Sequence, residues 1–389
     1  MADTNVQAPT LAELLTHHSE KWREFDRDVL PLPVAEMDFP IAEPIRRVLQ
    51  NMVAQSDLGY LGSVPELATG FAYFAAEQWG WNVDTSQVKI ASDVGVAVVE
   101  VLRVVTKPGD TILINSPVYQ NFYNWINETR LEKIDVPFTR VDTDSQTENP
   151  WQLDLNEVEK IYAAGLKVHL LCSPHNPLGR VYSKNELTRI ADMAKRYGVL
   201  VISDEIHAPL TFKSAEFIPF LALNDTAREV GITVTSASKG WNIAGLKCAI
   251  IVSQNELIKA QLDQMPKAVH SRASILGAFA SAAAFAEGGT WLDSVMSQLD
   301  FNRYLIRDLL AAKLPTVKYH FPDNSYFAWL DLSSLGLGED PSQILLEKGR
   351  VAFNSGSLYG AQCSQYVRLN FATSPEIITE AIERILNTL

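Results

Sequence analysis

The chain has 389 residues, of which 47% are hydrophobic and 20% are charged. A chain of this length and composition is globular and can bury the cores of one large domain and a smaller one. Its net charge is −13 at pH 7, from 33 Lys and Arg against 46 Asp and Glu residues. We therefore expect no nucleic-acid partner and no anionic membrane partner, because both bind basic surfaces.

The cysteines, the paired histidines and the N-terminus exclude further classes. Cys172, Cys248 and Cys363 are too few and too scattered for a disulfide framework or a zinc cluster. His17 and His18 lack other ligands nearby, so we predict no metal site. The first residues do not form a signal peptide, and no apolar run reaches the ~18 residues of a membrane span. These features predict a soluble, cytoplasmic protein.

The N-terminal region predicts an extended segment followed by helices. Residues 31–40 are bounded by prolines and are expected to be extended. Residues 42–53 are expected to form a helix and residues 59–62 a turn. Apolar residues then recur at helical spacing over residues 65–79.

Short apolar runs alternate with helical stretches through the middle of the chain. We predict seven strands, at residues 88–91, 111–114, 134–136, 168–172, 199–202, 232–235 and 248–252. Helices are expected between them, at residues 97–105, 120–130, 153–164 and 184–197. This alternation predicts an α/β layer with a mainly parallel sheet flanked by helices, whose ligands bind beyond the carboxyl ends of the strands.

The last third of the chain predicts a second, smaller α+β domain. Its helices are expected at residues 268–286, 290–314, 341–347 and 375–386, with strands near residues 316–320, 326–331, 350–353 and 366–371. We predict a large domain over residues 46–275 and a small domain over residues 276–389. The N-terminal segment, residues 1–45, is expected to pack with the small domain.

A lysine-bearing loop follows the predicted strand at residues 232–235. It contains Ser236, Ser238 and Lys239 and continues to Lys247. A lysine at the end of a strand can form an imine with a carbonyl compound, while hydroxyls and a second lysine can hold a phosphate. Pyridoxal phosphate (PLP) offers both groups. The same residues also fit an ordinary polar turn.

Other candidate residues follow the earlier strands. Gly95, Val96 and Ala97 open a helix, where free N–H groups and the positive helix end suit a phosphate. Tyr119 follows the second strand and is placed to stack on an aromatic ring. Each feature alone also fits a structural role, as a capping turn or as a half-buried packing residue.

Two polar residues follow the fourth and fifth strands. Asn176 lies in a loop fixed by prolines, and its amide can donate to a phenolate oxygen. Asp204 follows an apolar run, so its partly desolvated carboxylate needs a cation, such as a protonated pyridine nitrogen. A helix cap or an internal salt bridge is the alternative for Asp204. His169 and His175 are interpreted as structural.

Arg368 stands inside the apolar strand predicted near residues 366–371. A buried guanidinium requires a partner, and its fork matches the α-carboxylate of an amino acid. A buried structural ion pair is the alternative.

These motifs resemble those of the fold type I PLP enzymes, the aspartate aminotransferase superfamily, over nearly the whole chain. The specific matches are Asn176-Pro177-x-Gly179, Asp204-Glu205 and Ser236-x-Ser238-Lys239. Within that superfamily the chain most resembles the cystathionine β-lyase branch typified by MalY, PatB and cystalysin. This resemblance rests on Ser19-x-Lys21-Trp22, Val34-Ala35-Glu36-Met37-Asp38-Phe39, Gly59-Tyr60, Trp79-Gly80-Trp81, Ser173-Pro174-His175-Asn176-Pro177, Asp204-Glu205-Ile206-His207, Asn242-Ile243-Ala244-Gly245-Leu246 and Val367-Arg368-Leu369-Asn370.

The resemblance implies a role for each candidate residue. Lys239 is the implied Schiff-base lysine and proton shuttle, and Asp204 is the implied partner of the pyridine nitrogen. The remaining cofactor contacts that it implies are Tyr119 on the ring, Asn176 and His207 near the ring oxygen, and Ser236, Ser238 and Lys247 on the phosphate. Arg368, Ala35 and Tyr119 are the implied substrate contacts. The resemblance further implies a homodimer with shared active sites, in which Tyr60 reaches the neighbouring subunit's cofactor.

The function that follows is β-elimination of S-substituted cysteines to pyruvate, ammonia and a thiol. Transamination of an amino acid, which uses the same cofactor contacts, is the alternative. Regulatory binding of a transcription factor, as in one member of this branch, is a further alternative. The chain departs from the branch at Pro209, at Gly240-Trp241 and at Lys247, and these departures bear on substrate choice more than on reaction class.

Overall fold

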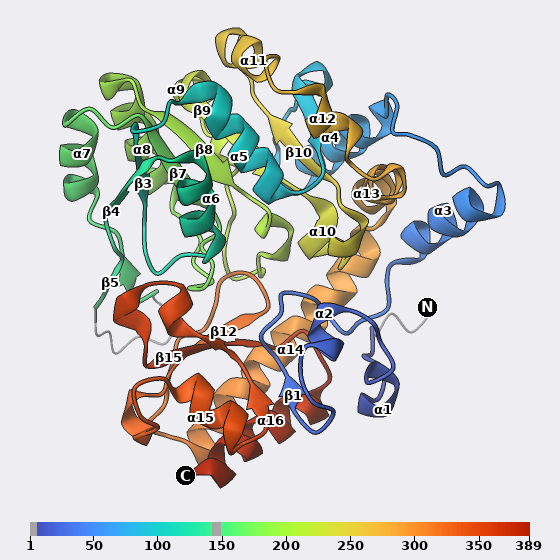
Figure 1. Cartoon of the computed structure of the whole chain (residues 1–389), viewed down its shortest axis with the longest axis vertical. Coiled ribbons are helices and arrows are strands. Elements are labelled where there is room, and N and C mark those ends of the chain that lie inside the picture. The colour runs from blue at the N-terminus through green and yellow to red at the C-terminus, as the bar shows by residue number, and fades with distance from the viewer. Residues whose placement is uncertain (1–5, 142–148) are drawn as a thin grey trace.

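The computed structural model describes residues 6–141 and 149–389 (Figure 1). Its centre is a seven-stranded sheet in the order β2-β10-β9-β8-β7-β3-β4. The strands are β2 (Val88–Ala91), β3 (Thr111–Ile114), β4 (Glu132–Asp135), β7 (Val168–Cys172), β8 (Leu200–Asp204), β9 (Gly231–Thr235) and β10 (Ala249–Val252). Only β10 runs antiparallel to its neighbours in this sheet. The predicted mainly parallel sheet is confirmed.

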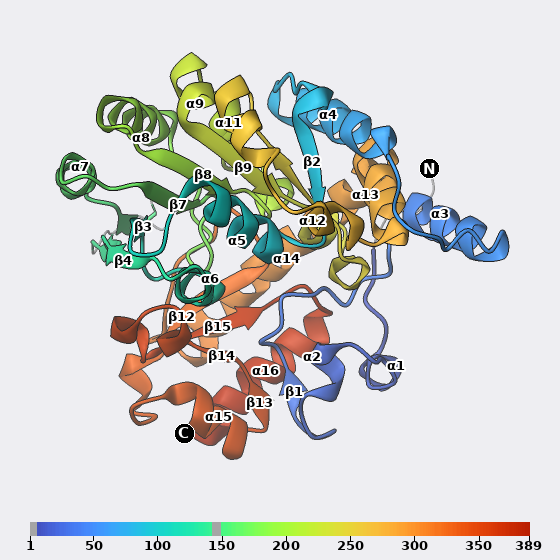
Figure 2. The same cartoon turned by 45° about the horizontal axis from the view of Figure 1, so that its top comes forward.

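Apolar side chains project from both faces of this sheet, as expected for parallel strands that are covered on both sides. Ile112 and Ile114 of β3 belong to one buried cluster, whereas Leu113 between them belongs to the other. The first cluster includes residues of α5 (Val94–Val105), α6 (Asn121–Thr129) and α11 (Glu256–Leu262). The second includes residues of α4 (Pro65–Trp79), α7 (Leu155–Ala163), α8 (Lys184–Tyr197), α9 (Asp225–Val230) and α13 (Ile275–Glu287). Figure 2 shows the sheet between its helices.

Two helices begin at places that the apolar periodicity did not predict. Helix α5 begins at Val94 because the Asp93 side chain caps its first turn. The helix expected over residues 268–286 is two helices, α12 (Lys267–Ser271) and α13. Ser274 interrupts it, because its hydroxyl accepts from the Gly277 amide and caps a new helix.

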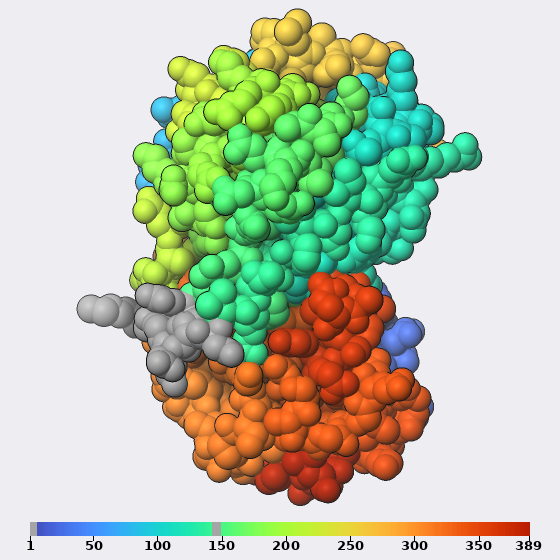
Figure 3. All heavy atoms as spheres, turned by 90° about the vertical axis from the view of Figure 1, so that its left-hand side faces the viewer, coloured from blue at the N-terminus to red at the C-terminus, as the bar shows by residue number. Residues whose placement is uncertain are grey.

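The C-terminal part of the chain forms a separate antiparallel sheet in the order β11-β12-β15-β14. Its strands are β11 (Lys318–Tyr319), β12 (Phe327–Asp331), β14 (Asn354–Ser355) and β15 (Tyr366–Asn370). The helices of this part are α14 (Gly289–Lys313), α15 (Pro341–Glu347) and α16 (Pro375–Thr388). In Figure 3 this orange and red part lies below the green part of the chain.

The N-terminal segment contacts the C-terminal part of the chain through one strand pair. Strand β1 (Leu30–Pro31) pairs in parallel with β13 (Val351–Ala352). The short helices α1 (Leu11–Leu14) and α2 (Glu20–Arg23) precede this pair, and α3 (Glu43–Ala54) leads to the large sheet (Figure 1). A further two-stranded sheet pairs β5 (Thr139–Arg140) with β6 (Trp151–Gln152). The expected domain boundaries remain predictions.

Within the described residues, no helix has the length and apolar character needed to cross a membrane.

Candidate active site

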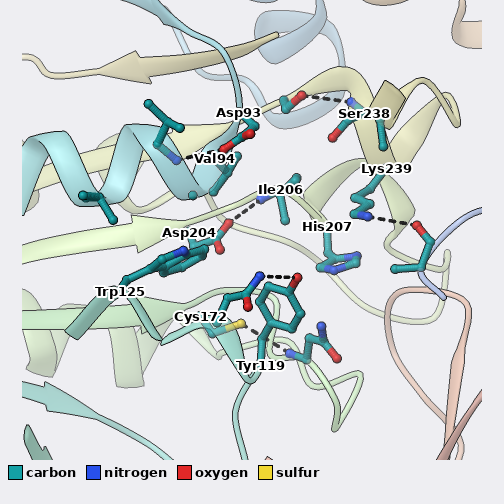
Figure 4. Close-up of a pocket in the computed structure, with 18 of the residues that line it drawn as sticks. Asp93, Val94, Tyr119, Trp125, Cys172, Asp204, Ile206, His207, Ser238 and Lys239 are labelled. Atoms are coloured by element: carbon teal, nitrogen blue, oxygen red, sulfur yellow. Dashed lines mark hydrogen bonds between the residues drawn. The ribbon is translucent and has the colours of Figure 1, made fainter. Parts of the chain in front are cut away.

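A cavity of about 420 Å³ lies at the carboxyl ends of the strands of the large sheet (Figure 4). Parallel strands end at one edge of a sheet, so the loops after β2, β3, β7, β8 and β9 meet there. The cavity is lined by most of the predicted site residues: Ala35, Gly95, Val96, Tyr119, Asn176, Asp204, His207, Ser236, Ser238, Lys239 and Lys247.

Asp204 is the last residue of β8 and is only 4% exposed. Its carboxylate accepts one hydrogen bond, from the Ile206 amide at 3.2 Å, and forms no ion pair with the described residues. Burial raises the pKa of Asp204 to about 7. A buried carboxylate that has so few partners fits a cationic group bound in the cavity, and the internal salt bridge considered for Asp204 is not formed by the described residues.

Lys239 lies in α10 (Ala237–Gly240), the short helix that follows β9. Its amine reaches the cavity and donates to the Ala35 carbonyl oxygen at 2.9 Å. Burial, and next the charge of Arg368, lower the pKa of Lys239 to about 8. An amine with this pKa is partly unprotonated near neutrality, which both a nucleophile and a general base require.

The first turn of α5 borders the cavity at the end suited to a phosphate. Asp93 Oδ1 accepts from the Val96 amide at 2.8 Å, and the Ala97 amide donates to the Asp93 carbonyl at 2.9 Å. The Gly95 amide has no acceptor among the described residues. A Cβ at position 95 would lie 3.0 Å from the Trp125 indole nitrogen. The Val94 and Gly95 amides are therefore the backbone donors of this turn that, among the described residues, remain open to an anion.

The loop after β9 contributes donors to the same end of the cavity. Ser236 donates its hydroxyl proton to the Cys248 carbonyl at 2.6 Å and accepts from the Ser238 amide at 3.0 Å. That proton is therefore not available for a phosphate. The Lys247 amine lies 3.5 Å from a carboxylate oxygen of Asp93. Ser238 and Lys247 remain the side-chain donors of this loop.

Arg368 belongs to β15, is 2% exposed and lies behind Asn176 rather than in the cavity lining. Its guanidinium donates to Asn176 Oδ1 at 3.1 Å and to the Pro33 carbonyl at 2.8 Å, and its Nε has no partner within the described part of the chain. It lies 3.8 Å from the centre of the Phe327 ring. The structural ion pair considered for Arg368 is not formed by the described residues, so its charge lacks a carboxylate.

The bond from Arg368 orients the Asn176 amide, because a guanidinium only donates. Asn176 Oδ1 faces Arg368, which leaves the NH₂ group to donate elsewhere. Tyr119 accepts a hydrogen bond from Asn121 Nδ2 at 2.8 Å (Figure 4). His207 is buried, and burial followed by the charges of Lys239 and Arg368 keeps its pKa well below the usual range.

Like Arg368, two other predicted site residues do not line the cavity. Tyr60, in the segment between α3 and α4, is 97% exposed. Ala97 is completely buried. The sequence analysis in turn missed Asp93, whose position before an apolar helix is an N-cap signal, and Trp125, for which the sequence offers no signal.

The histidines interpreted as structural form buried networks. His169 bonds through Nδ1 to the Tyr162 hydroxyl and through Nε2 to Asn115 Oδ1, both at 2.8 Å. His175 bonds through Nε2 to the Pro117 carbonyl at 2.8 Å. Neither histidine lines the cavity, which agrees with a structural role.

The sequence matches the aminotransferase class I and II family over residues 27–385. This chain belongs to that family.

Several relatives of this chain carry the names of lyases. The chain is 33% identical to a cystathionine beta-lyase of Corynebacterium glutamicum, covering 99% of this chain and 100% of that protein. It is 29% identical to the cystathionine beta-lyase PatB of Bacillus subtilis, covering 96% and 97%. The crystal structure of cystalysin from Treponema denticola, which contains a pyridoxal 5'-phosphate cofactor, matches with a TM-score of 0.91, 26% identity and coverage of 100% and 98%. The predicted fold is confirmed.

One departure from the lyase branch of the family has a structural explanation. Trp241 is completely buried, donates to the Gly288 carbonyl at 3.0 Å and packs against Phe74 and Phe285. A Cβ on the preceding Gly240 would lie 3.1 Å from Pro209. Gly240, Trp241 and Pro209 therefore form one packing arrangement, and Trp241 lies in the core and not in the lining of the cavity.

Proposed function

We propose that this protein is a PLP-dependent carbon–sulfur lyase that eliminates the thiol from S-substituted cysteines such as cystathionine. One observation carries the proposal. An amine with a pKa near 8, Lys239, and a buried carboxylate that forms no ion pair with the described residues, Asp204, line the same cavity. The printed names of relatives that match nearly the whole chain support the lyase reaction.

The residues present fit the cofactor. Asp204 would hold a protonated ring nitrogen, Lys239 the aldehyde carbon, and Asn176 with His207 the ring oxygen, with the Tyr119 ring stacked on the cofactor. Gly95, Ser238 and Lys247 would hold the phosphate, with Ser236 holding the Ser238 amide in place. When bound, the cofactor supplies an electron sink for the charge left by removal of a proton next to the amino group.

The chain's own residues would bind the substrate and move its proton. Arg368, whose Nε has no partner in the described part of the chain, would bind the α-carboxylate of the amino acid. The free Lys239 amine would take the α-proton and return a proton at a later step, because a pKa of about 8 permits both near neutrality. After the thiol has left, reaction of the remaining three-carbon product with one water gives pyruvate and ammonia.

The test of the cofactor site is a visible spectrum of the purified protein. We expect an absorbance band from covalently bound cofactor that Lys239→Ala abolishes or shifts to the non-covalent form. Lys213→Ala, which changes an exposed lysine that is not in the cavity lining, is the matched control. An unchanged band in Lys239→Ala would contradict the assignment.

The test of the reaction uses cystathionine with and without an added keto acid. A lyase releases pyruvate and a thiol without the keto acid, whereas an aminotransferase requires it and releases no thiol. Dependence on the keto acid would therefore favour transamination.

We propose further that the enzyme is a homodimer with shared active sites. Val53, Leu58 and Tyr60 are 58%, 54% and 97% exposed, which is unusual for three large apolar or aromatic side chains so close in sequence. Mixing Tyr60→Ala with Lys239→Ala protein tests the idea, since sharing predicts that hybrid dimers contain one intact site. The cytoplasmic location stays a prediction.

A further inference from the structure

The Ala35 carbonyl oxygen accepts two hydrogen bonds inside the molecule. Lys239 donates its amine at 2.9 Å, and Tyr326 donates its hydroxyl at 3.0 Å. Tyr326 is completely buried and directly precedes β12 of the C-terminal sheet. A carbonyl oxygen has two lone pairs, so Lys239 and Tyr326 together use the full acceptor capacity of Ala35.

The backbone on both sides of Ala35 is held by side-chain amides. Asn370 Nδ2 donates to the Val34 and Glu36 carbonyls, at 2.7 and 2.6 Å. Asn242 accepts from the Met37 amide and donates to the Met37 carbonyl, each at 2.8 Å. Asn242 follows the helix that bears Lys239, and Asn370 ends β15. Their hydrogen bonds therefore connect residues 34–37, the N-terminal strip, both to the Lys239 helix and to the C-terminal sheet. The Ala35 carbonyl therefore has a fixed direction.

We propose that Tyr326 is a positioning residue for Lys239, which acts by occupying one lone pair of the Ala35 carbonyl and so limits how tightly that carbonyl holds the free lysine amine. The proposal rests on the assignment of Lys239 as the reacting lysine. The Ala35 carbonyl cannot turn away, so the hydroxyl weakens it as an acceptor for the amine without displacing it. Two donors that share one acceptor each bind less strongly than one donor alone.

The consequence concerns the proton on Lys239. An ammonium gains more from a strong acceptor than a neutral amine does, so a weaker acceptor favours loss of the proton. The charged or titratable groups that face Lys239 are Arg368, Glu36, Lys247, Asp204 and His207. None of these five side chains bonds to the Ala35 carbonyl, so removal of the Tyr326 hydroxyl isolates the contribution of the shared acceptor.

The first experiment measures Lys239 in the full chain after bound cofactor has been removed with hydroxylamine and dialysis. The rate of acylation of Lys239 is followed against pH by peptide mass spectrometry, in the wild type and in Tyr326→Phe. We expect the midpoint to rise by about half a pH unit, from the strength of one shared charged hydrogen bond. Tyr162→Phe, which removes a buried hydroxyl bonded to His169, is the control and should leave the midpoint unchanged.

The second experiment measures removal of the α-proton in the holoenzyme. Exchange of the α-proton of L-alanine in D₂O, followed by NMR, separates this step from loss of a leaving group. In Tyr326→Phe we expect the acid limb of the rate to move up by the same half unit, roughly, with about a threefold lower rate at pH 7 that recovers at alkaline pH. KM for alanine should stay within about twofold, because the carboxylate contact is unchanged.

The outcomes separate the two hypotheses. An unchanged or lowered midpoint, or a rate loss that persists at alkaline pH, would overturn the role of Tyr326. Retention of alanine exchange by Lys239→Ala would instead overturn the assignment of the reacting lysine.

Discussion

Replacement of Arg368 by methionine separates a substrate-binding role from a structural one. The guanidinium is 2% exposed and has no carboxylate among the described residues. Methionine has a similar volume and packs well on the Phe327 ring, which now lies 3.8 Å from the guanidinium. The variant therefore removes a buried charge without opening a large cavity.

The expected effect on stability follows from the hydrogen bonds that are lost. The Pro33 carbonyl keeps a donor, because Asn354 Nδ2 lies 3.0 Å from it. Asn176 Oδ1 loses its donor, which costs about 1–3 kcal/mol. Replacing buried ionic groups with apolar ones gains about 1–4 kcal/mol. The two effects offset each other, so we expect the free energy of unfolding of Arg368→Met to stay within about 2 kcal/mol of the wild type.

The expected effect on activity is large. Loss of a charged contact to the α-carboxylate removes about 3 kcal/mol, or about 150-fold in kcat/KM, mostly through KM. Urea unfolding and steady-state release of pyruvate measure the two effects, with cofactor saturating in both.

A matched control is Arg303→Met. Arg303 is equally buried, at 4% exposed, but its Nε donates to Asp300 at 2.7 Å and it also bonds the Pro322 carbonyl. We expect this control to lose stability and Arg368→Met to keep it. If Arg368→Met lost more than about 3 kcal/mol, or kept its KM, the carboxylate-binding argument would be refuted.

Three further predictions concern buried titratable residues. Lys21→Met should lower the free energy of unfolding, measured in urea, by about 3–5 kcal/mol, because Lys21 is completely buried 2.7 Å from Asp38. The double variant with Asp38→Leu should recover part of this loss. An unchanged free energy of unfolding in the single variant would contradict the prediction. Burial lowers the pKa of His169 to about 3, so the unfolded state, with a histidine pKa of about 6.5, binds more protons below that pH and stability falls as the pH drops. From pH 7 to 5 the wild type should lose about 2 kcal/mol more than His169→Gln, and equal pH profiles would argue against a buried neutral imidazole. Asp204→Asn should lower kcat at least about 100-fold, because a neutral amide cannot keep a proton on the ring nitrogen. Covalently bound cofactor should still be seen in the visible spectrum. A near-normal kcat would contradict the proposed role of Asp204.

Much of the site was accessible from the sequence because parallel strands impose a simple geometry. Asp204 and Lys239 each follow an apolar run by a short distance, and the carboxyl ends of such strands meet at one edge. The predicted convergence of strand-end residues on a single cavity is therefore a consequence of local pattern. The start of α5 was missed by three residues because a cap depends on one side chain and not on periodicity.

The linear sequence determined the sheet, the strand ends and the reactive residue types, because short apolar runs and the polar loops that follow them are local properties. Only the tertiary structure decided that Arg368 lies behind Asn176 without a carboxylate partner among the described residues. The same holds for the hydrogen bond from the Ser236 hydroxyl to the Cys248 carbonyl and for the Ala35 carbonyl that accepts from both Tyr326 and Lys239. These contacts join segments far apart in the chain, and their donors and acceptors become defined only when the two sheets and the N-terminal strip pack together.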